Sequence, residues 1–171
     1  GELGSVNPMF LLPQAVAARA EALGQGWAGS LTMGAGQFCT NPGIAVVLDG
    51  TDADAFVAAT SAALAKIGPQ TMLTDGIAQA YRDGKERFEA RNAVRRVHTT
   101  PSQGREASPN LYETTADAYL QDHALGEEVF GPLGLVVTVA DAAEMPALAH
   151  RLEGQLTATL HMDDGDLAEA S

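Results

Sequence analysis

The chain of 171 residues is long enough for one domain with a substantial core, and 46% of its residues are hydrophobic while only 5% are aromatic. Its formal net charge of −12 disfavours nucleic acid and anionic membrane surfaces as partners, because both repel an acidic protein. The single cysteine cannot form an internal disulfide, which favours a reducing, cytoplasmic setting. We expect no membrane span and no signal peptide, because no apolar run is long enough and no basic stretch precedes one near the N-terminus.

Strand and helix patterns alternate along the chain. Short apolar runs bounded by turn residues predict strands, and apolar residues spaced by three or four predict helices. In chain order the predicted elements are a strand at 9–12, a helix at 14–33, a strand at 44–48, helices at 51–67 and 75–89, strands at 94–98 and 111–115, a helical turn at 116–120, a strand at 133–139, a helix at 142–152 and a strand at 156–161. This alternation predicts an α/β fold, a three-layer domain in which helices flank a largely parallel sheet.

Local signals set further expectations for helix ends, loops and core. Thr51 follows an Asp-Gly turn and is expected to cap the helix that begins there. The segment 99–110 is poor in apolar residues and rich in proline, glycine and serine, which predicts a mobile surface loop. Trp27 falls on the apolar stripe of the helix at 14–33 and is expected to pack in the core.

The only cysteine lies in the segment 36–43, GQFCTNPG, between the long helix and the strand at 44–48. Glycine accepts backbone angles that other residues avoid and Asn-Pro favours a turn, so the segment predicts a tight loop. Such a loop would place the sulfur of Cys39 near the edge of the sheet, within reach of a small molecule. Cys39 is therefore a candidate nucleophile, although a lone cysteine is more often a small buried hydrophobic residue.

Other site chemistries find less support in the sequence. The four histidines include no pair at the i, i+4 spacing of a helical metal site, so with one cysteine we expect no metal site. His161, at a strand end, is the candidate base if Cys39 serves a cysteine hydrolase. The run Gly34-Ala35-Gly36 lacks the third glycine of a dinucleotide fingerprint and follows a helix, so it does not predict a phosphate-binding loop.

Three separated motifs resemble those of a known family. They are ELGS at 2–5, GQFC at 36–39 and EEVFGP at 127–132. In this order and spacing the chain resembles the NAD(P)-dependent aldehyde dehydrogenase superfamily over essentially its whole length. The longer matches, GELGSVNP and GQFCTNPG, are most similar to 2,5-dioxovalerate (α-ketoglutarate semialdehyde) dehydrogenases, with NADP-linked fatty aldehyde dehydrogenases as near relatives in the same branch.

The resemblance implies roles for four residues. Cys39 would be the nucleophile that attacks the aldehyde carbon, with its own backbone N–H donating to the developing oxyanion. Glu2 would be the general base that activates the water for thioester hydrolysis. Glu128 would hold the hydroxyls of the nicotinamide ribose, and Phe130 would pack beside that ribose. Without the resemblance, Glu128 is a solvated residue beside a turn and Phe130 is a core residue.

The resemblance also implies that residues 1–171 are a catalytic-domain fragment. In family members the dinucleotide-binding domain lies largely upstream and the oligomerising tail downstream, so NADP or NAD would be bound mainly by the missing domain. We therefore expect no dehydrogenase turnover from these residues alone, and a homo-oligomer for the full-length protein. Ser5 stands where the family usually has a glycine, and Val6 where it usually has a lysine. The semialdehyde branch has the same two replacements.

The sequence leaves the substrate and the cofactor preference open. The resemblance favours an aldehyde substrate, 2,5-dioxovalerate oxidised to 2-oxoglutarate, with a fatty aldehyde and NADP as the alternative. An anionic semialdehyde needs a cation near the pocket, and Arg105 is the candidate. Outside the enzyme classes, a stand-alone interaction domain that keeps the fold without catalysis is the alternative.

Overall fold

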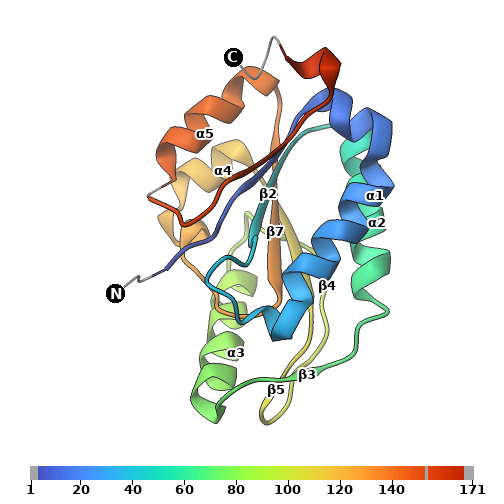
Figure 1. Ribbon diagram of the computed structural model, residues 1–171. Coiled ribbons are helices and arrows are strands. Elements are labelled where there is room, and N and C mark those ends of the chain that lie inside the picture. The colour runs from blue at the N-terminus through green and yellow to red at the C-terminus, as the bar shows by residue number, and fades with distance from the viewer. Residues whose placement is uncertain (1–3, 153, 168–171) are drawn as a thin grey trace.

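The structure, a computed structural model, describes residues 4–152 and 154–167 (Figure 1). Helices and strands alternate through most of the chain. In chain order they are β1 (Met9–Leu11), α1 (Pro13–Thr32), η1 (Met33–Gly36), β2 (Ile44–Leu48), α2 (Thr51–Leu64), β3 (Gln70–Thr71), α3 (Asp75–Glu89), β4 (Arg95–His98), β5 (Glu106–Ala107), β6 (Asn110–Thr115), α4 (Ala116–Gln121), η2 (His123–Gly126), β7 (Leu133–Val139), η3 (Ala142–Glu144), α5 (Met145–Arg151), β8 (Thr159–His161) and η4 (Asp164–Asp166), where η marks a 3₁₀ helix.

Six strands form the main sheet, in the order β4-β6-β7-β2-β1-β8. The neighbours from β6 to β8 pair in parallel, and β4 pairs antiparallel with β6 at one edge. The short strands β3 and β5 form a separate antiparallel pair. The predicted largely parallel sheet is therefore confirmed.

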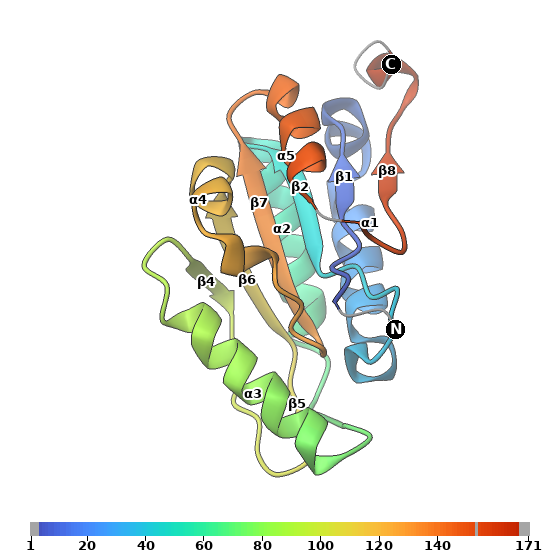
Figure 2. The same ribbon diagram turned by 90° about the vertical axis from the view of Figure 1, so that its left-hand side faces the viewer.

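Helices cover both faces of this sheet (Figure 2). Along β2, Ala45 and Val47 pack in one apolar cluster with residues of α1 and α2, including Trp27. The alternate residues Ile44 and Val46 pack in a second cluster with residues of α3, α4 and α5. Because successive side chains of a strand point to opposite faces, an apolar run such as β2 is buried on both sides. The three-layer prediction is confirmed, and so is the core position of Trp27, which is 2% exposed.

Several predicted boundaries coincide with the observed ones. The strands at 44–48 and 133–139 and the helix at 75–89 have the predicted ends. The predicted strand at 156–161 is shorter, because only Thr159–His161 pairs with β1. In the described part of the chain, no helix is both long and apolar enough to cross a membrane.

The prediction that Thr51 caps α2 is wrong. Thr51 is the first residue inside the helix, and Gly50 takes the N-cap position without a side-chain hydrogen bond. Gly50 has a φ of 138°, which a glycine adopts readily, so the chain turns into the helix one residue before the threonine. Asp52 and Asp54 in the first turn face the positive end of the helix dipole instead.

The prediction of a surface loop at 99–110 is also wrong in part. Residues 107–110 are buried, and Glu106–Ala107 pairs with β3. The Tyr81 hydroxyl donates to the carbonyl of Ser108 at 2.7 Å and accepts from the Asn110 side-chain amide at 2.8 Å. These long-range hydrogen bonds replace hydrogen bonds to water, and they allow the polar groups of this segment to be buried.

Candidate functional site

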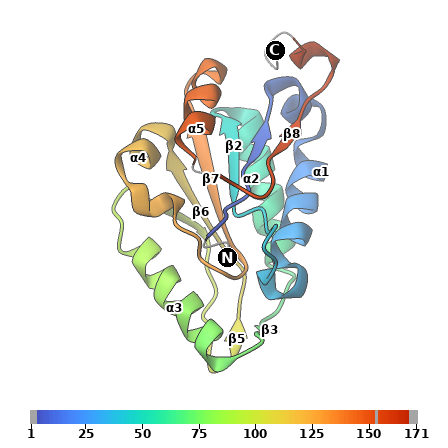
Figure 3. The ribbon, with the colours of Figure 1, turned by 60° about the vertical axis from the view of Figure 1, so that its left-hand side comes forward.

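Three motif-bearing segments meet at one end of the sheet. The entry segment (residues 4–8) leads into β1, the Cys39 loop (36–43) into β2, and the Glu128 segment (127–132) into β7. Since β7, β2 and β1 are parallel neighbours, their amino ends lie at the same end of the sheet. Figure 3 shows these segments entering the strands together. The strand order thus joins segments that are far apart in the sequence, at what we call the amino end of the sheet.

Backbone contacts lock the three segments together. The N–H of Gly43 donates to the carbonyl of Val6 at 2.9 Å, and the N–H of Leu135 donates to the carbonyl of Gly43 at 2.9 Å. Gly36 lies directly against Gly131, where a Cβ at position 36 would be 2.3 Å from the carbonyl carbon of Gly131. Gly36 also has a φ of 68°, so both its conformation and its surroundings require glycine.

The thiol of Cys39 is free and exposed, as predicted from its loop. The turn around it is closed by a hydrogen bond from the N–H of Asn41 to the carbonyl of Phe38 at 3.0 Å. The carbonyl of Cys39 accepts from the side-chain amide of Asn7 at 2.8 Å. Within the described residues, the backbone N–H of Cys39 donates to no carbonyl and no side chain. That N–H is thus available to a bound ligand.

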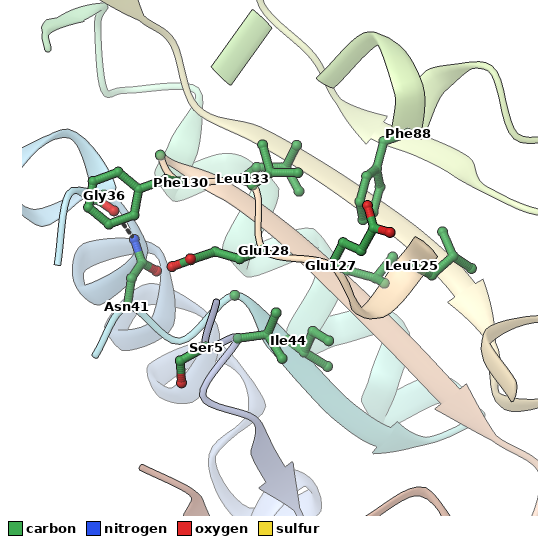
Figure 4. Close-up of a pocket in the computed structure, with 15 residues that line it drawn as sticks. Ser5, Gly36, Asn41, Ile44, Phe88, Leu125, Glu127, Glu128, Phe130 and Leu133 are labelled. Atoms are coloured by element: carbon green, nitrogen blue, oxygen red, sulfur yellow. Dashed lines mark hydrogen bonds between the residues drawn. The ribbon is translucent and has the colours of Figure 1, made fainter. Parts of the chain in front are cut away.

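A cavity of about 30 Å³ lies behind the loop and is lined by residues from all three segments. It has room for roughly one water molecule. Glu128 and Phe130 both line it and are half-buried. Figure 4 shows the Glu128 carboxylate pointing toward Asn41, while the Phe130 ring lies beside Gly36. Both residues predicted to contact the cofactor therefore face the loop that holds Cys39.

Asn41 is a site residue that the sequence did not single out. Its side-chain N–H groups donate to the carbonyls of Leu31 at 3.1 Å and Gly36 at 2.9 Å, which fixes the orientation of the amide. Its Oδ1 atom is buried and has no hydrogen-bond partner among the described residues. A buried acceptor without a donor is costly, so this oxygen points to a missing donor at the cavity.

Tyr81 on α3 packs against the Glu128 segment. Its ring packs against Gly131, where a Cβ would be 2.3 Å from the ring, and its hydroxyl lies 3.3 Å from the carbonyl of Pro132. Burial raises the pKa of Tyr81 well above its ordinary value, so the hydroxyl stays a neutral donor. Gly131 is therefore held between Tyr81 on one side and Gly36 on the other.

Two further residues were predicted from the sequence, Glu2 and Arg105. Glu2 is outside the described residues; Gly4 is the first one described, and a Cβ there would be 3.8 Å from the Cβ of Glu128. Arg105 donates through Nε to the carbonyl of Met72 at 2.9 Å. In the described ranges no group of three histidine, cysteine, aspartate or glutamate side chains could hold a metal ion.

His161 lies at the opposite end of the sheet from Cys39. It pairs with Leu11 at the carboxyl end of β1, whereas the Cys39 loop precedes the amino end of β2. Burial, assisted by the charge of Arg19, lowers the pKa of His161 below its ordinary value. The structure therefore does not bring His161 to Cys39, and the hydrolase pairing considered from the sequence is not formed.

Known proteins similar to this chain were found by sequence. No protein-family model matches it. The chain is 44% identical over 167 residues to alpha-ketoglutaric semialdehyde dehydrogenase 2 of Azospirillum brasilense, covering 96% of this chain and 32% of that protein. The chain is a domain of the aldehyde dehydrogenase superfamily. Alpha-ketoglutaric semialdehyde dehydrogenase of Acinetobacter baylyi is 34% identical over 172 residues, covering 99% of this chain and 33% of that protein.

Solved structures show the same fold. A NAD-dependent benzaldehyde dehydrogenase from Corynebacterium glutamicum superposes with a TM-score of 0.81 at 23% identity, over 99% of this domain and 37% of that chain. A gamma-glutamyl-gamma-aminobutyraldehyde dehydrogenase from Burkholderia cenocepacia superposes with a TM-score of 0.81 at 20% identity, over 99% and 36%. The aldehyde dehydrogenase domain described here spans about a third of the length of the curated relatives it matches.

Proposed function

We propose that this domain carries the nucleophile of an NAD(P)-dependent aldehyde dehydrogenase, and that residues 1–171 are its catalytic domain. The observation that carries the proposal is the convergence of the three motif segments around the exposed Cys39 at the amino end of the sheet. An exposed thiol beside a free backbone N–H suits attack on a carbonyl, because the same residue supplies the nucleophile and a donor to the oxyanion.

The chain's own residues account for the two half-reactions as follows. The Cys39 thiolate adds to the aldehyde carbon and forms a thiohemiacetal, whose oxygen accepts from the N–H of Cys39. When bound, NAD(P)⁺ supplies the hydride acceptor that turns this adduct into a thioester. Glu2 then removes a proton from water, which attacks the thioester carbonyl and releases the carboxylate and the Cys39 thiolate.

Two residues of the Glu128 segment suit the ribose of a nicotinamide cofactor. The Glu128 carboxylate is a hydrogen-bond acceptor, and vicinal ribose hydroxyls are donors. The half-buried Phe130 offers an apolar face on the same side. In this role Glu128 orients the ribose and Phe130 packs beside it.

For the substrate we propose 2,5-dioxovalerate, oxidised to 2-oxoglutarate, with a fatty aldehyde as the alternative. The names of the two relatives, both alpha-ketoglutaric semialdehyde dehydrogenases, support the first choice. The full-length enzyme should then give a higher kcat/KM with 2,5-dioxovalerate than with a long-chain aldehyde, under NADP⁺ or NAD⁺. A preference for the long-chain aldehyde would contradict 2,5-dioxovalerate as the substrate but would not contradict the proposed reaction class.

The nucleophile is tested by Cys39→Ala in the full-length protein. Aldehyde oxidation should fall by at least about a thousandfold, because the covalent route is removed. Thr40→Ser, an exposed conservative change in the same loop, is the matched control and should stay within about twofold of the wild type. NAD(P)⁺-dependent oxidation that survives in Cys39→Ala would overturn the proposal.

A further inference from the structure

Asn7 occupies an unusual place beside the Cys39 loop. It is 2% exposed, and its φ of 45° lies in the left-handed region, which asparagine and glycine tolerate better than other residues. Strained backbone of this kind persists where the surrounding structure holds it and tends to gather at functional sites. In the sequence, Asn7 precedes Pro8 at the end of the motif GELGSVNP.

The amide nitrogen of Asn7 holds the backbone of the Cys39 loop. Nδ2 donates to the carbonyl of Cys39 at 2.8 Å and to the carbonyl of Asn41 at 3.0 Å. The first carbonyl belongs to the peptide group between Cys39 and Thr40 and the second to the one between Asn41 and Pro42, so one side chain fixes two peptide groups of the loop. The orientation of the Cys39 carbonyl limits where its Cα, and therefore its thiol, can lie.

The amide oxygen of Asn7 anchors the side chain to two other segments. Oδ1 accepts from the Ser5 hydroxyl at 2.8 Å, and from the N–H and the hydroxyl of Thr157, both at 3.1 Å. With donors on the oxygen and carbonyls at the nitrogen, the amide fits in one orientation only. Asn7 therefore joins the strand entries of β1, β2 and β8 around the nucleophile.

We propose that Asn7 is a positioning residue that sets the orientation of the Cys39 thiol and of its N–H. The inference rests on the proposed function in that Cys39 is the nucleophile, but Asn7 itself acts through the loop and touches neither substrate nor cofactor. Its loss would leave the carbonyl of Cys39 without a donor and the carbonyl of Asn41 with only the N–H of Gly43, and would free the turn to rotate. A displaced thiol or N–H lowers the rate of the chemical step more than it weakens substrate binding.

Two substitutions separate positioning from packing in the full-length protein. Asn7→Gly keeps the backbone conformation and removes every side-chain hydrogen bond. Asn7→Asp keeps the shape and the acceptor, but sets a negative charge against two carbonyls beside the thiol. Thr60→Val is the matched control: it removes a buried hydroxyl on α2 that donates to the carbonyl of Phe56 at 2.8 Å.

The decisive readout is the rate of Cys39 alkylation by iodoacetamide as a function of pH, followed by mass spectrometry on folded protein at a fixed interval below each Tm. Asn7→Asp should slow alkylation at pH 7.5 several-fold, because the added charge opposes formation of the thiolate. Asn7→Gly should lower kcat at least tenfold with KM changed less than threefold. Thr60→Val should lower Tm and leave both readouts unchanged.

The proposal is overturned if Asn7→Gly loses stability yet keeps its alkylation profile and kcat within twofold of the wild type. If both Asn7 variants fail to fold, the double variant Ser5→Ala, Thr157→Val removes two donors from Oδ1, and an unchanged alkylation profile there also overturns the proposal. If the wild type shows no dehydrogenase turnover, the proposed function fails while the alkylation profiles still decide the role of Asn7.

Discussion

The two ends of the parallel strands use their buried polar groups in opposite ways. At the carboxyl end, the fully buried Asp166 accepts hydrogen bonds from the N–H groups of Gln14, Ala15 and Asp163. These bonds satisfy the start of α1 and place a negative charge at the positive end of its dipole. At the amino end, the buried Oδ1 of Asn41 has no donor among the described residues, and the thiol of Cys39 is exposed.

The backbone conformation also differs between the two ends of the sheet. Most described residues with positive φ lie in the segments at the amino end or in η1 just before them: Gly4, Asn7, Gly34, Ala35, Gly36 and Gly131, whereas Gly50 lies at the carboxyl end and Gly104 in the 99–110 segment. Ligands of open α/β sheets usually bind beyond the carboxyl ends of the strands. Here the buried carboxylate of Asp166 at the carboxyl end is satisfied, whereas most of the strained backbone, the exposed Cys39 and the unpartnered Oδ1 of Asn41 lie at the amino end. These groups, more than strand polarity, mark the candidate site.

The largest effect is expected from Gly36→Ala at the amino end. The new Cβ would meet the backbone of Gly131 at 2.3 Å and would strain a φ of 68°, so the free energy of unfolding should fall by roughly 3 kcal/mol or more. Gly26→Ala is the control, because it lies in α1 with nothing within 4 Å of its Cβ and should gain roughly 0.5–1 kcal/mol. Urea unfolding measures both, and similar values for the two variants would refute the close contact.

At the carboxyl end, Asp166→Ala should lower the free energy of unfolding by about 2 kcal/mol, because three N–H groups lose their acceptor. The rate of Cys39 alkylation in the folded protein should stay the same, since Asp166 lies at the opposite end of the sheet from Cys39. The exposed Asp164→Ala is the control, with a change within about 0.5 kcal/mol. Slower alkylation in Asp166→Ala would remove the distinction between the two ends.

A smaller effect is expected for cofactor binding. In the full-length protein, Glu128→Gln should weaken NAD(P)⁺ binding by roughly tenfold, because a charged acceptor of ribose hydroxyls becomes neutral. Glu127→Gln is the matched control: the carboxylate of Glu127 points away from Asn41 and its residue is exposed (Figure 4). Isothermal titration gives both Kd values, and equal values would argue against contact between Glu128 and the ribose.

The smallest effect concerns His161. Its pKa is lowered in the folded state, so the unfolded chain binds more protons and this group's contribution to stability is lost as pH falls below the ordinary value near 6.5. His161→Gln should slightly flatten the fall in Tm between pH 7.5 and pH 5, whereas the exposed His150→Gln should not. Neither change should alter Cys39 alkylation. Slower alkylation in His161→Gln would restore the hydrolase pairing.

The sequence predicted elements well wherever a single periodic pattern decides the structure. The apolar runs at 44–48 and 133–139 are strands with the predicted ends. The segment 99–110 was misjudged because its burial depends on the distant hydroxyl of Tyr81, which no local pattern reveals. Thr51 was misjudged because the conformation of Gly50 decides where α2 begins.

The candidate site was predicted in its parts and not in its assembly. The motifs located Cys39, Glu128 and Phe130, but only the strand order brings their segments to one end of the sheet. Asn7 and Asn41 were missed, since their roles depend on hydrogen bonds across the fold. Each precedes a proline inside a motif, and that repeated Asn-Pro pair is the signal in the sequence that could have found them.

The contact between Gly36 and Gly131 has a consequence for how the site can move. The two backbones are in direct contact, with no side chain between them. A displacement of the Cys39 loop therefore also displaces the Glu128 segment. Thermal motion at this end of the domain would then move the Cys39 thiol and the Glu128 carboxylate together and preserve the distance between them. A swap of either loop from a homologous enzyme should succeed only when its neighbour is exchanged at the same time.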